Sequence, residues 1–387
     1  MSMALRVACC VASGKPADFL FRISDFGFRL ARMKSRKMVQ SLLRWFGRNA
    51  RELPWRRTRD PYAIWVSEIM LQQTQVKTVV PYWRRWMRAL PDMAAVARAK
   101  PERLHKLWEG LGYYARVRNL QKAAQLIVEK HGGRFPEEFE RVLELPGIGR
   151  YTAGAICSIA FNQPKPILDG NVARVLTRLF GVAGNPREKE TNTRLWEIAE
   201  ELVRRAAKPS DLNQALMELG ALVCTPREPR CGVCPVAVHC VAYRQGRVQE
   251  LPSLGQRVRA MPRRFVAFVA RKGGRLLVRQ RPAGVVNAHL WEFPNAELGP
   301  DDSGLRRAAR RVLGLRPKTL QPLCVIKHSI TRYRITLEVF RVAGNQRVGA
   351  APAKGRWVRE KELSQLAFAS AHKKILRRLE IEGGLRT

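Results

Sequence analysis

Four cysteines that lie close together in the sequence form the clearest candidate for a chemical site. Cys224, Cys231, Cys234 and Cys240 follow the spacing Cys-x6-Cys-x2-Cys-x5-Cys. Four thiolates from one loop suit either an iron–sulfur cluster or a tetrahedral zinc ion. Zinc ribbons usually use two tight pairs separated by a longer loop, whereas this set has a single x2 pair. A chain of 387 residues does not need a disulfide framework, so the spacing predicts metal binding in a reducing compartment, with unligated cysteines as the remaining alternative.

A short turn with two glycines stands between two apolar stretches of helical periodicity. Its sequence is Leu-Pro-Gly-Ile-Gly-Arg over residues 145–150, and Gly147 and Gly149 allow a tight turn and a close approach of the backbone. A helix is expected at Tyr151–Ile159, and the backbone N–H groups at its start can hold a phosphate. Taken alone, the turn could also be an ordinary connection between two helices.

Two carboxylates stand in distinctive runs on either side of this turn. Glu68 lies in the run Trp-Val-Ser-Glu-Ile-Met-Leu-Gln-Gln-Thr-Gln-Val over residues 65–76, and Asp169 lies in Ile-Leu-Asp-Gly-Asn-Val-Ala-Arg over residues 167–174. A glutamate in a helical stretch usually faces solvent, and an aspartate before a helix is often its N-cap. Both alternatives remain open from the residues alone.

Together these motifs resemble the MutY family of the endonuclease III, or helix-hairpin-helix, superfamily. The resemblance covers roughly residues 38–387 and includes the run Leu-Pro-Trp-Arg over residues 53–56. It implies an all-α DNA glycosylase domain whose four cysteines hold a 4Fe–4S cluster, followed by an α+β Nudix-like (MutT-like) domain. For members of this family the expected substrate is double-stranded DNA with adenine mispaired with 8-oxoguanine or guanine.

The resemblance also implies a reaction, the hydrolysis of the N-glycosidic bond of adenine. Adenine leaves poorly as an anion, so an acid must protonate it, and a carboxylic acid in an apolar pocket has a raised pKa that suits this task. A second, ionised carboxylate can stabilise the oxocarbenium-like sugar or attack it. The family pattern makes Glu68 the general acid and Asp169 the stabiliser or nucleophile, with Tyr151 and Asn171 completing the site. Related lyases carry a lysine nucleophile at the position of Tyr151, so a monofunctional enzyme is expected.

The family pattern implies further contacts with DNA. They are Trp55 and Arg56 at the adenine pocket, Gln73, Thr74, Leu111 and Tyr113 in the base stack, Gly147 and Gly149 at the backbone, and Thr331 at the lesion. Ordinary core packing is the alternative for Leu111 and Tyr113.

The C-terminal part changes from helical to mixed patterning. Apolar runs around Gly273-Gly274 predict a hairpin over residues 265–278, residues 305–313 predict a helix that ends at Gly314, residues 333–342 predict a strand, and a helix is expected from Leu363 onward. The stretch 305–315 would carry the metal-binding glutamates of a Nudix hydrolase, but it contains no carboxylate, so recognition rather than hydrolysis is expected.

The loop expected to touch the lesion departs from the family pattern. The usual Phe-Ser-His is replaced by Ile330-Thr331-Arg332, in which Thr331 keeps a hydroxyl. The change bears on discrimination between 8-oxoguanine and guanine, and a plain strand without DNA contact is the alternative.

Charge and composition agree with a polyanionic partner. The net charge is +39, which favours binding to phosphate backbones, with a merely basic surface as the alternative. No uninterrupted apolar run reaches the roughly 18–20 residues of a membrane helix. We expect a monomer without a membrane contact, cytoplasmic and nucleoid-associated in a bacterial-type cell.

The expected organisation has four parts. They are an N-terminal extension at 1–37, disordered or due to a misassigned start, a helical domain of about ten helices at 38–244 with the cluster loop at 224–240, a linker at 245–262, and the Nudix-like domain at 263–387.

Two other functions remain possible, a bifunctional glycosylase/lyase of the endonuclease III type and a non-catalytic iron–sulfur module that binds DNA.

Overall fold

The computed structural model describes residues 36–255, 259–299, 304–314, 317–343 and 355–382. All but the last two residues of the expected N-terminal extension therefore lie outside the described part. Within the described part, none of the helices combines the length and the apolar character needed to span a bilayer. The chain forms two compact units, one made of the residues up to Arg51 with Asn162–Ser253, and the other made of Glu52–Phe161 with Leu254–Thr387. The expected domain boundaries stay a prediction.

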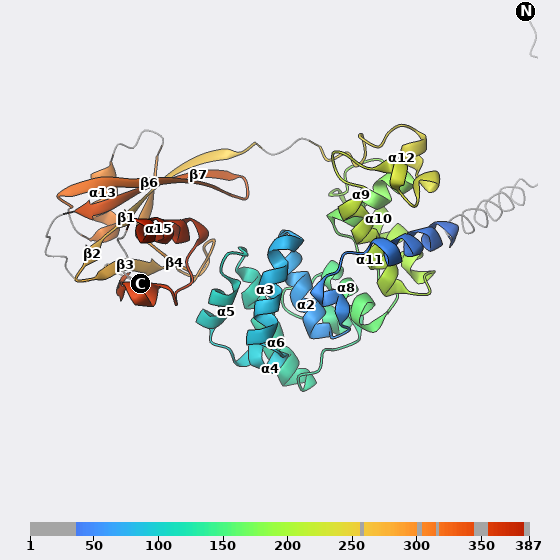
Figure 1. The fold of residues 1–387 in the computed structure, drawn as a ribbon, viewed down its shortest axis with the longest axis horizontal. Helices are drawn as coiled ribbons and strands as arrows, with labels where there is room; N and C mark the ends of the chain where they lie inside the picture. Colours follow the sequence, from blue (N-terminus) through green and yellow to red (C-terminus); the bar gives the residue numbers. More distant parts are fainter. Residues whose placement is uncertain (1–35, 256–258, 300–303, 315–316, 344–354, 383–387) are drawn as a thin grey trace, which may run out of the picture. The chain divides into compact units, whose positions relative to one another are not determined.

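The first unit is helical (Figure 1). Besides a helix over residues 36–49, it contains α9 (Gly170–Phe180), α10 (Lys189–Arg204), α11 (Pro209–Leu222), α12 (Val241–Arg244) and the short 3-10 turns η2 (Cys231–Val233) and η3 (Ala237–His239). Helix α9 contacts α10, α11 and α12. It buries Val172, Val175, Leu176 and Leu179, whose spacing forms one apolar stripe on a helix. The carboxyl end of α9 stops at Gly181, which adopts the left-handed conformation.

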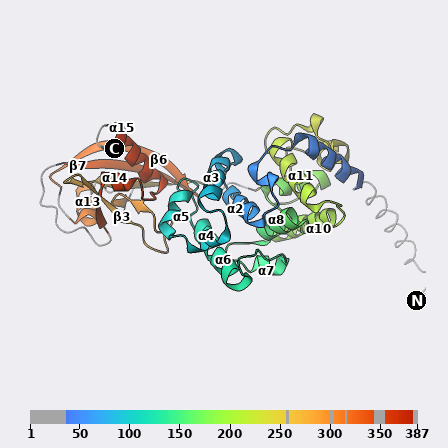
Figure 2. The same cartoon turned by 60° about the horizontal axis from the view of Figure 1, so that its bottom comes forward.

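The helical part of the second unit is built around one buried helix. Its elements are η1 (Pro54–Arg57), α2 (Pro61–Leu71), α3 (Val76–Ala89), α4 (Met93–Arg98), α5 (Pro101–Trp108), α6 (Ala115–His131), α7 (Phe139–Leu143) and α8 (Arg150–Phe161). Helix α2 contacts α3, α6 and α8 and lies among them in both views (Figures 1 and 2). Asp60 caps it by accepting a hydrogen bond from the Tyr62 amide, and Pro61 suits its first turn. Every residue from Tyr62 to Met70 is buried, including Glu68.

The described residues of the C-terminal part of the second unit form two sheets and three helices. The first sheet has the order β5-β1-β7-β6, with β1 (Met261–Val269), β5 (Asn295–Leu298), β6 (Thr319–Ile330) and β7 (Tyr333–Ala343). The second contains β2 (Arg271–Lys272), β3 (Arg275–Gln280), β4 (Trp291–Glu292) and β8 (Gly355–Arg359). Helix α13 (Leu305–Leu313) contacts β1 and β5, α15 (Ser370–Ile381) contacts β6, and α14 (Glu360–Leu363) follows β8. The expected succession of an all-α part and an α+β part is confirmed.

The predicted hairpin over residues 265–278 is wrong in its pairing. The turn is where the glycines predict it, and Gly273 and Gly274 both have positive φ. However, the arm that pairs with β3 is only β2, whereas β1 joins the other sheet between β5 and β7. The apolar runs identify strands but do not specify their partners, because pairing depends on contacts far away in the sequence. The last helix also begins later than predicted, at Ser370.

Candidate active site and cysteine loop

Glu68 lies within the buried helix α2 and is hydrogen-bonded to Tyr151. Its side chain is in the core, with the residue only 4% exposed, and the Tyr151 hydroxyl donates to Glu68 Oε2 at 2.7 Å. Tyr151 comes from the first turn of α8, which packs on α2. Burial of a carboxylate in an otherwise apolar helix is costly, so this placement favours a chemical role over a solvated helix face. The structure thus brings together two of the four predicted catalytic residues.

The turn before α8 explains how Tyr151 is positioned. The Ile148 amide donates to the Leu145 carbonyl at 3.1 Å, and Gly147 has a φ of 80°. Proline followed by a positive-φ glycine is the signature of a type II turn. A Cβ on Gly147 would lie 2.7 Å from Asn119 Cβ, whereas a Cβ on Gly149 would meet nothing within 4 Å. Gly147 is therefore required by the turn, while Gly149 leaves open space beside the start of α8.

Asp169 and Asn171 lie in the other compact unit, at the start of α9. Asp169 is the N-cap, and its Oδ1 accepts from the Val172 amide at 2.7 Å. Its Oδ2 accepts from Asn171 Nδ2 at 3.0 Å. Asp169 is therefore an N-cap, as the alternative interpretation predicted. Capping uses only Oδ1, and Oδ2 is bound by Asn171. These are the other two predicted catalytic residues, and they contact each other.

A chain of hydrogen bonds runs from Asp169 to the cysteine loop. Asn171 Oδ1 accepts from Arg174 Nη2 at 2.9 Å, and Arg174 Nε donates to the Cys224 carbonyl at 2.7 Å. Arg174 Nη2 also donates to the Gly220 carbonyl at 2.8 Å. Arg174 is the last residue of the run that contains Asp169, and its type and position in the sequence did not predict this role. An arginine on α9 gives no sequence signal that separates this role from a solvated charge.

The four cysteines of the loop line one small pocket. Cys224, Cys231, Cys234 and Cys240 share it with Arg178, Val223, Ala237, Tyr243 and Val248. All four are free thiols. Arg178 Nη1 donates to Cys224 Sγ at 3.4 Å, and Arg178 holds the loop through the carbonyls of Thr225 and Pro226. Among the described residues, no group of three or more His, Cys, Asp or Glu is arranged so that it could hold a metal ion. The donor set, four thiols that line one pocket beside Arg178, is nevertheless of the chemical type that holds an iron–sulfur cluster.

Arg116 connects two loops that carry predicted DNA contacts. Its Nη1 donates to the carbonyls of Ile69, Met70 and Gln72, and its Nη2 donates to those of Leu111 and Gly112, all within 3.1 Å. Burial lowers the pKa of this guanidinium to about 10. Arg116 follows the predicted contacts Leu111 and Tyr113 in the sequence, but the sequence alone gave it no role. Its function becomes visible only when the end of α2 and the loop before α6 are placed side by side.

The predicted DNA contacts differ in exposure. Gln73 and Tyr113 are exposed, Thr74 and Arg56 are half-buried, and Trp55 and Leu111 are in the hydrophobic core. Trp55 packs edge-on against Trp83, with 6.0 Å between ring centroids. The burial of Leu111 matches the core-packing alternative in the structure as it stands.

Three of the predicted DNA contacts have strained backbones. Gln73, Tyr113 and Thr331 have φ values of 55°, 48° and 51°, a region that side-chain-bearing residues rarely adopt. Such strain is often found at binding sites, where the surrounding structure stabilises it. Arg116 provides that support at the first two positions.

Thr331 lies at the tip of the β6–β7 hairpin. Ile330 pairs with Tyr333, so Thr331 and Arg332 form a two-residue turn, and both are exposed. The Thr331 hydroxyl donates to the Ile330 carbonyl at 2.7 Å. Arg332 lies over the Tyr333 ring at 5.3 Å, and its hydrogen bond lowers the pKa of the Tyr333 hydroxyl. Thr331 is therefore on an exposed turn and not within a strand.

These features define a class of protein, and comparison with known proteins agrees. Residues 66–201 match the HhH-GPD superfamily of base excision DNA repair proteins, and residues 266–378 match the NUDIX domain. A solved structure of a thermostable thymine-DNA glycosylase is similar to the helical part, with 30% identity and a TM-score of 0.51, over 56% of this chain and 99% of that one. The protein is therefore a helix-hairpin-helix DNA glycosylase with a C-terminal Nudix-like domain.

Curated relatives specify the family. The adenine DNA glycosylase of Homo sapiens is 37% identical over 87% of this chain and 73% of the human protein. That of Mus musculus is 37% identical over 88% of this chain and 77% of the mouse protein. The chain belongs to the adenine DNA glycosylase family, and it is a DNA-repair enzyme that hydrolyses N-glycosyl bonds.

Proposed function

We propose that this protein is a monofunctional glycosylase that removes adenine mispaired with 8-oxoguanine or guanine from duplex DNA. The observation that carries the proposal is the 2.7 Å hydrogen bond from the Tyr151 hydroxyl to the buried Glu68 carboxylate. A lyase needs an amine at this position to form a Schiff base with the sugar, and a tyrosine has none. The family membership and the net charge of +39 support duplex DNA as the substrate.

The two carboxylates take different roles in this proposal. Glu68 donates a proton to the adenine so that the base leaves as a neutral molecule, and Tyr151 orients the carboxyl group. The Asp169 carboxylate stabilises the positive charge that develops on the sugar. The hydrogen bonds from the Val172 amide and Asn171 hold that carboxylate in place at the start of α9. One carboxyl group thus acts as the acid and the other as the anion.

The proposal includes a 4Fe–4S cluster bound by the cysteine loop. Cys224, Cys231, Cys234 and Cys240 would hold it, and Arg178 and Arg174 link the loop to α9. When bound, the cluster would supply structural order to a basic loop and not chemistry on the sugar. The loop carries Arg227 and Arg230, which are placed to attract phosphate by their charge.

The C-terminal domain is proposed to recognise 8-oxoguanine without hydrolysing nucleotides. Helix α13 carries arginines at 306, 307, 310 and 311 and no carboxylate, so it cannot hold Mg²⁺ as a Nudix hydrolase does. Thr331 at the exposed hairpin tip provides a hydroxyl that can donate and accept a hydrogen bond. We further propose that the enzyme acts as a monomer.

A single-turnover assay tests the proposal. The duplex contains one 8-oxoguanine:adenine pair, with a guanine:adenine duplex beside it, and the products are analysed with and without hot alkali. The expected result is strand breakage only after alkali, with faster excision opposite 8-oxoguanine. Equal breakage without alkali would identify an intrinsic lyase. Intact strands in both lanes, with mismatch binding retained, would indicate a non-catalytic module.

A further inference from the structure

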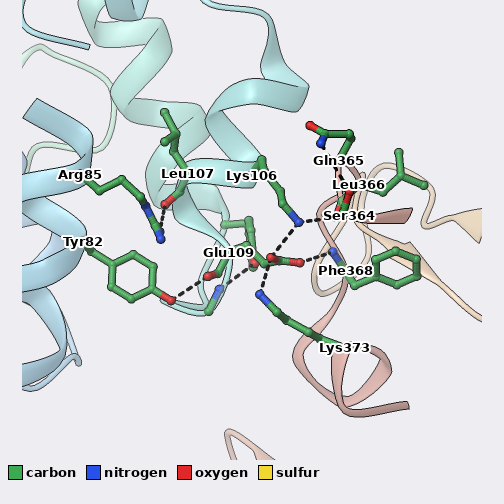
Figure 3. A network of polar contacts seen from close by, with 12 residues as sticks. Tyr82, Arg85, Lys106, Leu107, Glu109, Ser364, Gln365, Leu366, Phe368 and Lys373 are labelled. Atoms are coloured by element: carbon green, nitrogen blue, oxygen red, sulfur yellow. Dashed lines mark hydrogen bonds and ion pairs between the residues drawn. The ribbon is translucent and has the colours of Figure 1, made fainter. Parts of the chain in front are cut away.

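A buried carboxylate links the helical part of the second unit to its C-terminal domain. Glu109, directly after α5, is only 6% exposed. Its Oε1 accepts from the Phe368 amide at 2.9 Å, and its Oε2 accepts from Lys373 Nζ at 2.5 Å and Lys106 Nζ at 3.1 Å (Figure 3). Burial raises the pKa of Glu109, but these hydrogen bonds outweigh that effect and lower the pKa overall. The carboxylate is therefore held in its charged form.

Other contacts surround this network. Lys106 Nζ donates to the Leu366 carbonyl at 3.0 Å, so the same lysine contacts both sides. Leu290, Ala367 and Ala369 of the C-terminal domain belong to the same hydrophobic cluster as the helical core. His105 and His289 stack with 6.4 Å between ring centroids and 9° between ring planes. Apolar packing and ring stacking thus accompany the polar network between the same two parts of the unit.

Glu109 is also next to the loop that carries Tyr113. Its backbone carbonyl accepts from the Tyr82 hydroxyl of α3 at 2.7 Å, and the following Gly110 amide donates to the Tyr114 hydroxyl at 3.3 Å. A Cβ on Gly110 would lie 2.2 Å from the Tyr82 hydroxyl, so the chain is tightly held here. Glu109 thus contacts the C-terminal domain through its side chain, and its backbone leads directly into the loop that carries Tyr113.

We infer that Glu109 is a positioning residue that couples the C-terminal domain to the Tyr113 loop, and thereby makes adenine excision sensitive to 8-oxoguanine. The inference rests on the proposed function, because it assumes that the C-terminal domain recognises the lesion. The domain must be held in one position for a contact at the hairpin tip to affect excision. A charged carboxylate with three donors from two parts of the chain provides that fixed position.

The test uses Glu109→Gln and Lys373→Met in the full-length, cluster-loaded enzyme. Glu109→Gln keeps the shape of the side chain but removes its charge, and Lys373→Met removes one donor. The matched controls are Glu102→Gln, on the exposed side of α5, and Lys374→Met, the exposed neighbour of Lys373. Single-turnover excision rates are measured opposite 8-oxoguanine and opposite guanine. Hydrogen exchange of the peptide that contains the Phe368 amide reports the contact itself.

The expected result is a loss of preference with little loss of basal excision. Both variants should keep the rate opposite guanine within about twofold and lower the ratio of the two rates by about tenfold, in the range reported for coupling through packed networks. The Phe368 peptide should exchange faster, while both control variants should behave as the unmodified enzyme.

Two outcomes would overturn the inference. One is an unchanged ratio in the variants when the unmodified enzyme shows a preference. The other is an equal fall of both rates, since that would indicate a general effect on folding. An unmodified enzyme without any preference for 8-oxoguanine would refute the proposed function instead, whatever the variants do.

Discussion

At the scale of single residues, Glu68 combines burial with one defined partner. It occupies the middle of an apolar helix and accepts a hydrogen bond from Tyr151. Glu68→Gln keeps this shape and the hydrogen bond but has no acidic proton to transfer. We expect adenine excision to slow by at least about a thousandfold, within the usual range for loss of general acid catalysis. Single-turnover excision and mismatch binding measured on the same preparation check this.

The control for this prediction is Glu102→Gln, an equal charge change on α5. Mismatch binding should persist in Glu68→Gln, because the amide is nearly the same size as the acid. A variant that still excised adenine at the normal rate would show that another group protonates the base.

Arg116 is a second residue whose individual role can be measured. Its guanidinium donates to carbonyls of both the α2 end and the Leu111 loop, and a lysine has a single nitrogen that cannot reach both sets. Arg116→Lys should lower the free energy of unfolding by about 2 kcal/mol, since buried carbonyls lose their donors. Urea unfolding checks the stability, and titration of a mismatched duplex checks the expected loss of affinity.

Arg103→Lys is the matched control, since exposed Arg103 makes a single bond to the Ala89 carbonyl at 2.9 Å. If Arg116→Lys were as stable as this control and bound DNA equally well, the two loops would not depend on Arg116.

At the scale of elements, the contact between α9 and α11 determines where Asn171 lies. Gly220 of α11 faces α9, and a Cβ there would lie 2.7 Å from Asn171 Cβ and 3.0 Å from its carbonyl oxygen. Gly220→Ala must therefore push the helices apart at the residue that contacts Asp169. We expect a loss of about 1–3 kcal/mol in the free energy of unfolding, typical of overpacking, together with slower excision.

Gly47→Ala provides the comparison, because a Cβ at Gly47 meets nothing within 4 Å and lies in a helix of the same unit. That change should be neutral or stabilising. Thermal unfolding should occur at a lower temperature in Gly220→Ala and at an unchanged or higher temperature in Gly47→Ala, and only Gly220→Ala should excise adenine more slowly. Equal behaviour of the two variants would mean that the close approach at Gly220 is not needed.

Local sequence patterns predict elements well where the apolar residues have one clear period. The stripe on α9 and the helix that ends at Gly314 are examples, because periodicity and a left-handed glycine are local features. The pairing of β1 with β7 instead of β3 could not be predicted, because it depends on residues some seventy positions away. Helix α2 is buried on all sides, so its sequence has no polar face to reveal its orientation.

The residues of the candidate site also divide into those that local sequence predicts and those that only the fold reveals. Glu68, Asp169 and the cysteines have distinctive local runs, and the structure pairs Glu68 with Tyr151 and Asp169 with Asn171. Arg116, Arg174 and Glu109 have no such signal, because a charged residue on a helix is normally solvated. Their roles arise from carbonyls and amides that folding brings to them.

At the scale of the whole molecule, buried histidines predict how stability depends on pH. Burial lowers the pKa of His105 and of His372 from 6.5 to about 4. Both lie in the second compact unit, and His372 also faces Glu292, whose pKa is lowered by His372 and two arginines. All three shifts make the folded state less tolerant of acid.

The sign follows from proton uptake. Between pH 6.5 and about 4 the unfolded chain protonates these histidines and the folded chain does not, so stability must fall as the pH falls. Each histidine contributes up to about 1.4 kcal/mol per pH unit in that window. Urea unfolding at pH 7 and pH 5 should show a lower midpoint at pH 5.

In His372→Gln, whose amide oxygen can still accept from the Phe293 amide, this difference between the two midpoints should shrink. His131→Gln, at the end of α6, should leave it unchanged, and a pH-independent midpoint in the unmodified protein would mean that the histidines titrate equally in both states.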